Sequence, residues 1–141
     1  MASCSNSLIN TCVNKVPSVY LFRLGTVEDL RKQLYIPQRH ADNCIVLKYG
    51  RTIDLRRRMS EHRRSFRVRL PPVDPVLVYH SLIHPNYLVK AEKNIEAWFK
   101  DAHLYLENQE HTELAIVTRC VLKKQVRRQY EMLSELYYPF N

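Results

Sequence analysis

Glycine is almost absent from this chain, and its scarcity limits where the backbone can turn tightly. Only Gly25 and Gly50 occur among 141 residues. Each directly follows an apolar segment that predicts a strand: residues 18–24, rich in β-branched and aromatic side chains, and residues 44–49. We therefore expect each glycine to end a strand and to be required there for a positive φ or for a close approach between neighbouring groups.

Strand and helix patterns alternate along the rest of the chain. We expect helices at 26–34, 55–65 (capped by Asp54), 85–106 and 121–136, a strand at 76–83, and a strand or extended segment at 113–118. Short links between the early strands favour an α+β fold with a small, mainly antiparallel, three-stranded central sheet, flanking helices and a docked C-terminal helix. Residues 1–16 are expected to be a flexible tail before a single domain at 17–141.

Composition limits the class of protein. Apolar residues make up 45% and charged residues 26%, which predicts a packed core. No apolar run approaches the roughly 20 residues that cross a bilayer, and no secretory signal is visible, so we expect an intracellular protein without a membrane partner. The four cysteines form no Cys-x-x-Cys pair, which excludes a zinc knuckle and a dense disulfide framework and predicts reduced thiols.

Positive charge is concentrated in one segment. The chain has a formal net charge of +8, and residues 48–69 hold nine basic against two acidic residues, a net of +7. Such a block indicates a phosphate-rich partner, although a solvated helix face is an equally good interpretation of charge alone. Arginine favours forked contacts with phosphate. The candidate nucleic-acid-binding residues are Arg51, Arg56, Arg57, Arg63, Arg64 and Arg67.

The same segment carries a motif. Residues 48–62 read Lys-Tyr-Gly-Arg-Thr-Ile-Asp-Leu-Arg-Arg-Arg-Met-Ser-Glu-His. This resembles the second half of the GIY-YIG nuclease signature, and Ser-Val-Tyr at 18–20 resembles the first half. The first triplet lacks its glycine, and Lys48 replaces the leading tyrosine of the second. The sequence is closer to the branch found in phages and large DNA viruses, whose members often accompany Bro- or KilA-N-type DNA-binding domains. We therefore expect a virus-encoded protein that acts in the host cell.

The resemblance implies cleavage of DNA phosphodiester bonds with one divalent metal held by a helix glutamate. Carried onto this sequence, the catalytic residues are Tyr20, Lys48, Tyr49, Arg58, His62 and Glu92. Tyr20, with Lys48 or Tyr49, would orient or deprotonate the attacking water. Arg58 would neutralise charge that builds on the phosphate. The superfamily pattern thus implies a hydrolase, with DNA preferred over RNA on family grounds alone.

Helical spacing separates two candidates for the metal ligand. Glu92 falls inside the apolar stripe of the helix expected at 85–106, and Glu96 sits at its margin. A carboxylate on a core-facing stripe is costly unless a cation or donor meets it, so Glu92 is the first choice and Glu96 the alternative. A single carboxylate with waters and phosphate suits Mg²⁺ or Mn²⁺. A salt bridge between Glu92 and Arg58, without metal, is the competing interpretation.

Arg58 and His62 share one helix face, four residues apart. An arginine on a half-buried face needs an anion, which a bound phosphate would supply, as would an ion pair with Glu92 or Glu96. For His62, a hydrogen-bonded structural role and a catalytic role remain open.

Three functions are compatible with these residues. The first is a divalent-metal-dependent endonuclease. The second is a catalytically inactive nuclease fold that binds nucleic acid or a protein partner, which the altered triplets favour. The third is a protein-interaction domain whose basic face meets an acidic protein. The sequence leaves open whether cleavage requires a homodimer and which DNA structure is preferred.

Overall fold

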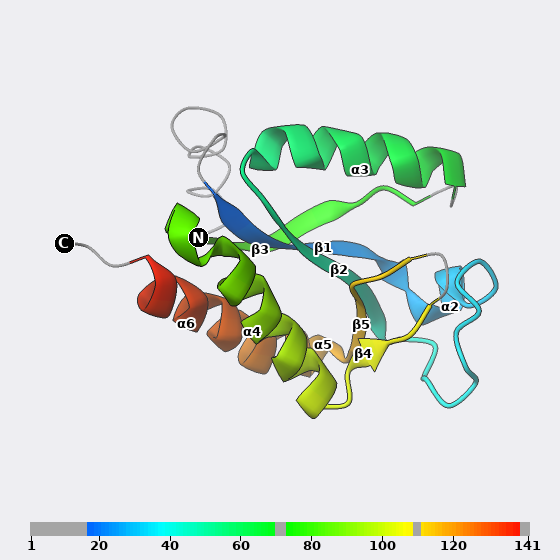
Figure 1. Ribbon diagram of the computed structural model, residues 1–141. Helices are drawn as coiled ribbons and strands as arrows, with labels where there is room; N and C mark the ends of the chain where they lie inside the picture. Colours follow the sequence, from blue (N-terminus) through cyan, green and yellow to red (C-terminus); the bar gives the residue numbers. More distant parts are fainter. Residues whose placement is uncertain (1–16, 70–72, 109–110, 139–141) are drawn as a thin grey trace.

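A five-stranded antiparallel sheet forms the centre of the molecule (Figure 1). The computed structural model describes residues 17–69, 73–108 and 111–138, so the tail expected at 1–16 lies outside the described residues. The strands are β1 (Ser18–Thr26), β2 (Ile45–Thr52), β3 (Val76–Leu82), β4 (Tyr105–Leu106) and β5 (Leu114–Val117). Their spatial order is β3-β1-β2-β5-β4, which places β1 and β2 in the interior of the sheet.

Helices cover both faces of this sheet. They are α2 (Val27–Leu30), α3 (Leu55–Arg69), the 3₁₀ turn η1 (Pro85–Tyr87), α4 (Leu88–Asp101), α5 (Arg119–Val121), the π-helical η2 (Leu122–Val126) and α6 (Arg127–Tyr137). In Figure 1, α3 lies on one side of the sheet, and α4 and α6 lie on the other. None of the helices in the described part of the chain is long and apolar enough to cross a membrane.

Successive side chains of β1 pack alternately into two hydrophobic clusters, one on each face of the sheet. Val19 and Leu21 pack in the cluster that holds α4 and α6, whereas Tyr20 and Phe22 pack with Leu55 at the start of α3. Successive side chains of a strand point to opposite faces. Because both faces are covered, β1 is apolar along most of its length rather than alternating apolar with polar.

The α+β class is confirmed, but the expectation of a three-stranded sheet is wrong. β5 pairs with β2, and β4 pairs with β5. The long helix was expected to reach residue 106 but ends at Asp101. His103 adopts a positive φ of 58°, which reverses the chain and allows Tyr105–Leu106 to pair as a strand.

The two glycines lie inside strands, which corrects the expectation that they end them. Gly25 has a φ of +158° beside the β-bulge of β1, and Gly50 pairs with Tyr20 across β1 and β2. A Cβ at Gly50 would lie 2.6 Å from Tyr20 Cζ. Gly25 therefore meets the expected requirement for an unusual φ, and Gly50 meets the expected requirement for a close approach.

The C-terminal helical segment docks on the sheet as expected. Buried Val126, Tyr130 and Leu133 join the main core cluster. The Tyr130 hydroxyl donates a hydrogen bond to the Tyr20 carbonyl at 3.1 Å. This bond ties the last helix to the strand that carries the first candidate catalytic residue.

Candidate active site

An open pocket of about 230 Å³ lies between α3 and α4. Its lining residues are Tyr20, Arg51, Arg58, Glu92 and Glu113. Four of the five were candidates from the sequence, and they come from β1, β2, α3 and α4. The pocket lies near the end of β2, where β2 extends beyond β5. The two strands pair only from Ile45 to Lys48 of β2. Beyond that pairing, Arg51 is exposed and is the β2 residue that lines the pocket.

Tyr20 lines this pocket, and His62 of α3 contacts the Tyr20 hydroxyl. Tyr20 is 1% exposed, and its hydroxyl oxygen lies 2.9 Å from His62 Nε2 in a hydrogen bond. Burial raises the pKa of Tyr20 well above its usual range, with the positive charge of Arg58 opposing that shift. Burial, reinforced by Lys48 and Arg58, lowers the pKa of His62 to about 4. Both side chains are therefore uncharged at neutral pH.

Arg58 presents a donor that the protein itself does not use. Asp54 caps α3 by accepting a hydrogen bond from the Arg57 backbone N–H at 3.1 Å, which sets the start of the helix. Among the described residues the buried Arg58 Nε has no hydrogen-bond partner, although it forms an ion pair with Glu61 Oε1 at 3.4 Å. A buried N–H without a hydrogen bond is costly, and an anion in the pocket would relieve that cost.

Glu92 lies on α4 with its carboxylate turned into the pocket. Its side chain is 12% exposed, and it forms an ion pair with Arg51. Burial raises the pKa of Glu92, the carboxylate of Glu113 raises it further, and Arg51 opposes the shift. The ion pair between Arg58 and Glu92 or Glu96, one interpretation of the sequence, does not form among the described residues.

Glu96 and Tyr49 lie away from the pocket. The Tyr49 hydroxyl donates a hydrogen bond to Glu96 Oε2 at 2.9 Å, and the Tyr49 ring stacks on Phe99 with 5.2 Å between centroids. Tyr49 is fully buried in the α4 core cluster, on the opposite sheet face from Tyr20. Of the two metal-ligand candidates, Glu92 and not Glu96 lines the pocket with Tyr20 and Arg58.

Glu113 is the lining residue that sequence reasoning missed. Lys48 Nζ donates to Glu113 Oε2 at 3.3 Å and to the Thr112 carbonyl at 2.7 Å. Glu113 has a positive φ of 65° immediately before β5, so the chain turns there and presents its carboxylate beside Lys48. The one available signal was an acidic residue at the first position of the expected 113–118 segment.

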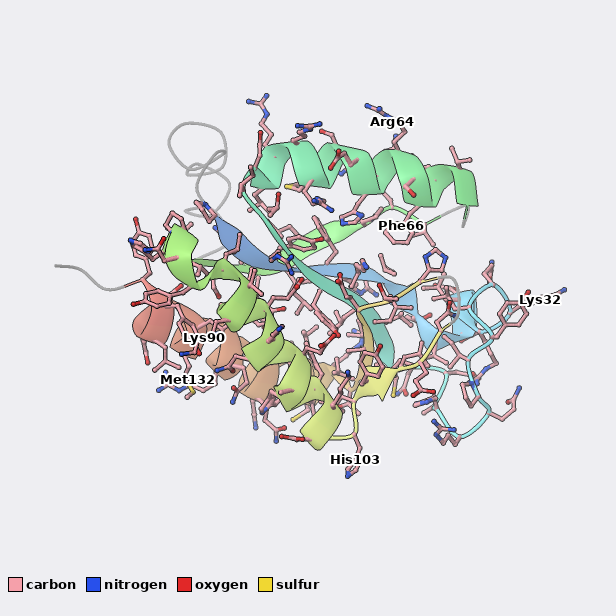
Figure 2. The ribbon with its side chains drawn as sticks, in the orientation of Figure 1. Lys32, Arg64, Phe66, Lys90, His103 and Met132 are labelled. Atoms are coloured by element: carbon pink, nitrogen blue, oxygen red, sulfur yellow. The ribbon has the colours of Figure 1, made fainter. Side chains whose placement is uncertain are left out.

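The remaining predicted nucleic-acid contacts project from α3. Arg56, Arg57, Arg63, Arg64 and Arg67 are all exposed. In Figure 2, Arg64 points away from the sheet and Phe66 points toward it. Two of these arginines have acidic neighbours: Arg57 lies 3.7 Å from Glu61 and Arg67 lies 3.4 Å from Asp74. The face is therefore strongly but not wholly positive.

The donor set suits a hard divalent cation bound through few protein ligands. The described residues contain no group of three or more His, Cys, Asp or Glu side chains that could hold a metal ion. Two carboxylates, Glu92 and Glu113, do line the same pocket. Mg²⁺ commonly uses one or two carboxylates together with waters and substrate phosphate, so these residues fit such an ion and do not fit a closed cage.

Comparisons with known proteins identify relatives of this chain. A family model described as the T5orf172 domain matches residues 32–130, which include every lining residue except Tyr20. Two Acanthamoeba polyphaga mimivirus proteins, the uncharacterized proteins L12 and L5, are 35% and 34% identical over 112 and 115 residues, or 79% and 82% of this chain. A third, R865, is 38% identical over 89 residues, 63% of the chain.

The chain spans only part of these relatives. It covers 23% of L12, 25% of L5 and 15% of R865. No solved structure gives a significant match.

Proposed function

Because the chain belongs to the T5orf172 domain family, we propose that it is a divalent-metal-dependent endonuclease that hydrolyses DNA phosphodiester bonds through a GIY-YIG-type site. One observation carries the proposal. The pocket brings Tyr20, Arg58 and Glu92 together from three elements, and among the described residues the buried Arg58 Nε has no hydrogen-bond partner. A cationic donor for the phosphate and carboxylates that can hold a divalent ion are groups that metal-assisted phosphodiester hydrolysis uses.

Arg58 is the phosphate-binding group in this mechanism. Its guanidinium donates to a non-bridging phosphate oxygen, and its fixed charge stabilises the negative charge that grows there in the transition state. Arg58 projects from α3, the same helix that carries the exposed arginines. Binding of the DNA backbone to those arginines therefore also positions a phosphate at Arg58. Those arginines contact the DNA backbone and carry no base specificity.

Tyr20 and His62 act on the attacking water. The neutral Tyr20 hydroxyl accepts a hydrogen bond from the water and so orients a lone pair of the water toward phosphorus. The hydrogen bond to His62 Nε2, at 2.9 Å, fixes the position of the Tyr20 hydroxyl. The low pKa of His62, about 4, makes this pair an orienting device rather than a strong base. The proton that the attacking water loses therefore passes to bulk solvent through the open pocket, and the departing oxygen takes a proton from solvent. Lys48, held by Glu113, is positioned to assist from the neighbouring strand.

Glu92, with Glu113 opposite, would hold the Mg²⁺ or Mn²⁺ ion in the pocket. When bound, the ion supplies polarisation of the phosphate and stabilisation of the leaving oxygen. In the structure, Arg51 forms an ion pair with the Glu92 carboxylate. Arg51 therefore has to move toward the substrate phosphate for Glu92 to serve as a ligand.

A nucleic-acid-binding module without cleavage is the second candidate. It is favoured by the ion pairs that already neutralise both pocket carboxylates, Arg51 with Glu92 and Lys48 with Glu113. We further propose, from the mimivirus relatives, that the chain is virus-encoded and acts on DNA in the infected cell.

A cleavage assay tests the proposal. Duplex, single-stranded, flapped and four-way DNA are incubated with Mg²⁺ or Mn²⁺ and the wild type, Glu92→Gln, or the matched control Glu96→Gln one helical turn away. Glu92→Gln should lose roughly a hundredfold or more in rate, while Glu96→Gln stays within a few-fold. DNA binding in EDTA should survive both changes.

The outcomes separate the two candidates. Metal-dependent cutting that is lost in Glu92→Gln supports the endonuclease. If the wild type binds every substrate but cuts none with either metal, the endonuclease proposal fails and the binding module replaces it. Cutting that survives Glu92→Gln and is lost in Glu96→Gln would overturn the assignment of the pocket.

A further inference from the structure

A second basic surface lies on the C-terminal helical segment, outside the 48–69 block. Residues 119–128 contain five basic and no acidic residues. All five side chains are exposed. They are Arg119, Lys123, Lys124, Arg127 and Arg128. We call this set the 119–128 surface.

Packing directs these charges outward together. Leu122, Val126 and Tyr130 are buried against the sheet, so the side chains between them point away from it. Lys123 and Arg127, like Lys124 and Arg128, are four residues apart and neighbours along the helix surface. The π-helical turn at Leu122–Val126 joins α5 to α6 without a break, so the two rows form one continuous face.

Acidic residues oppose this charge at its α6 end, where Glu131 lies four residues after Arg127 and Glu135 pairs with Arg128. Among the described residues, the 119–128 surface makes one ion pair, between Arg128 and Glu135 at 3.3 Å. On α3, in contrast, Glu61 and Asp74 compensate three of the arginines. A row of like charges raises the local potential and attracts an extended polyanion.

The chemistry of the surface selects among polyanions. None of the exposed large hydrophobic side chains of the described residues lies in 119–128. A membrane-surface helix needs an apolar face to insert, and here that face is buried in the sheet. Protein interfaces likewise centre on apolar or aromatic anchors. A charged face without anchors is typical of contacts to a nucleic-acid backbone.

The two basic faces point in opposite directions. Leu55 and Met59 of α3 pack on the sheet face of Tyr20 and Phe22, whereas η2 and α6 pack on the other face. Figure 1 shows α3 above the sheet and α5 and α6 below it. A straight duplex lying on α3 cannot also reach residues 119–128.

We propose that the 119–128 surface binds a second segment of duplex nucleic acid, so that one molecule holds two segments, one on each side of the sheet. The inference does not depend on cleavage. It gives the domain the capacity to bridge two duplexes or two arms of one branched molecule. Failure of the nuclease proposal would leave it intact.

A bridging assay in EDTA tests this. One 30-base-pair duplex is fixed to beads, an unrelated fluorescent duplex is free in solution, and the protein is added. Wild type should retain the fluorescent duplex. Lys123→Glu/Lys124→Glu should reduce retention about tenfold, yet bind a single duplex within a few-fold of wild type. The charge-matched control, Lys32→Glu/Arg39→Glu, changes exposed residues elsewhere and should retain the duplex.

Further measurements decide against the alternatives. Arg63→Glu/Arg64→Glu on α3 should also abolish retention, because two faces are required. Retention by Lys123→Glu/Lys124→Glu at the wild-type level would overturn the proposal, since a dimer bridging through two α3 faces predicts that result. Failure of the wild type to retain the second duplex would also overturn it. The proposal would also be overturned if Lys123→Glu/Lys124→Glu lost binding to anionic phospholipid vesicles while its duplex retention stayed unchanged.

Discussion

The ring of Tyr20 lies against Gly50 on the adjacent strand, where a Cβ would come within 2.6 Å of Tyr20 Cζ. Gly50→Ala should therefore force the tyrosine from its position and destabilise the fold by about 1–3 kcal/mol. Urea denaturation monitored by circular dichroism measures the change. In a Tyr20→Leu background the same substitution should cost much less, because residues in contact are not additive. Equal costs in both backgrounds would contradict the contact.

Tyr20→Phe and Tyr49→Phe form a matched pair. Both remove one buried hydroxyl, but only the Tyr20 hydroxyl belongs to the pocket. Tyr49→Phe should cost about 1 kcal/mol in unfolding free energy through the lost bond to Glu96 and leave the cleavage rate within about twofold. Tyr20→Phe should lower the rate about tenfold or more. Single-turnover cleavage measures both, and a larger loss in Tyr49→Phe would reverse the assignment.

His62 should make the fold sensitive to mild acid. Its pKa in the folded protein is lowered to about 4, against 6.5 in the unfolded chain. Between these values the unfolded state binds more protons, so this contribution to stability is complete above about pH 6.5 and is lost as the pH falls toward 4.

The measurement is the unfolding free energy at several values between pH 4 and 7. His62→Gln should show a shallower decline than the wild type. A residual decline is expected, because burial also lowers the pKa of His80. Identical slopes in the two proteins would show that His62 is not held neutral by the fold.

Glu113 can be removed without straining the backbone. Its φ of 65° is one that glycine adopts freely, so Glu113→Gly should stay within about 1 kcal/mol of wild-type stability. Lys48 then loses its carboxylate partner, and cleavage should fall about tenfold. Glu113→Gln, which keeps a hydrogen-bond acceptor for Lys48, should retain more activity.

A pH profile distinguishes this role from a purely structural one. The Glu113 carboxylate raises the pKa of Glu92, so either substitution should move the acidic limb of the rate profile to lower pH. An unchanged limb together with an unchanged rate would exclude Glu113 from the site.

Local pattern was sufficient for the parts of the site that lie on single elements. The Asp54 cap and the four-residue spacing placed Arg58 and His62 on one face of α3. The apolar stripe of the expected helix placed Glu92 toward the interior. These predictions depend on helical periodicity over a few turns, which the sequence expresses directly.

Local pattern did not determine which residues meet across elements. Glu113 reaches Lys48 over 65 positions of chain, and Arg51 reaches Glu92 over 41. β4 forms after the helix ends at Asp101 and His103 adopts a positive φ, which the helix pattern through residue 106 concealed.

The sequence by itself determined the α+β class, the two central strands and the helix faces, because each follows from interactions between residues close in the chain. Only the tertiary structure decided that Tyr49 and Glu96 pair away from the pocket, that Glu113 enters it, and that a second basic surface lies on the opposite side of the sheet. Those outcomes depend on strand order and register, which are set by packing between distant segments and leave no periodic trace in the chain.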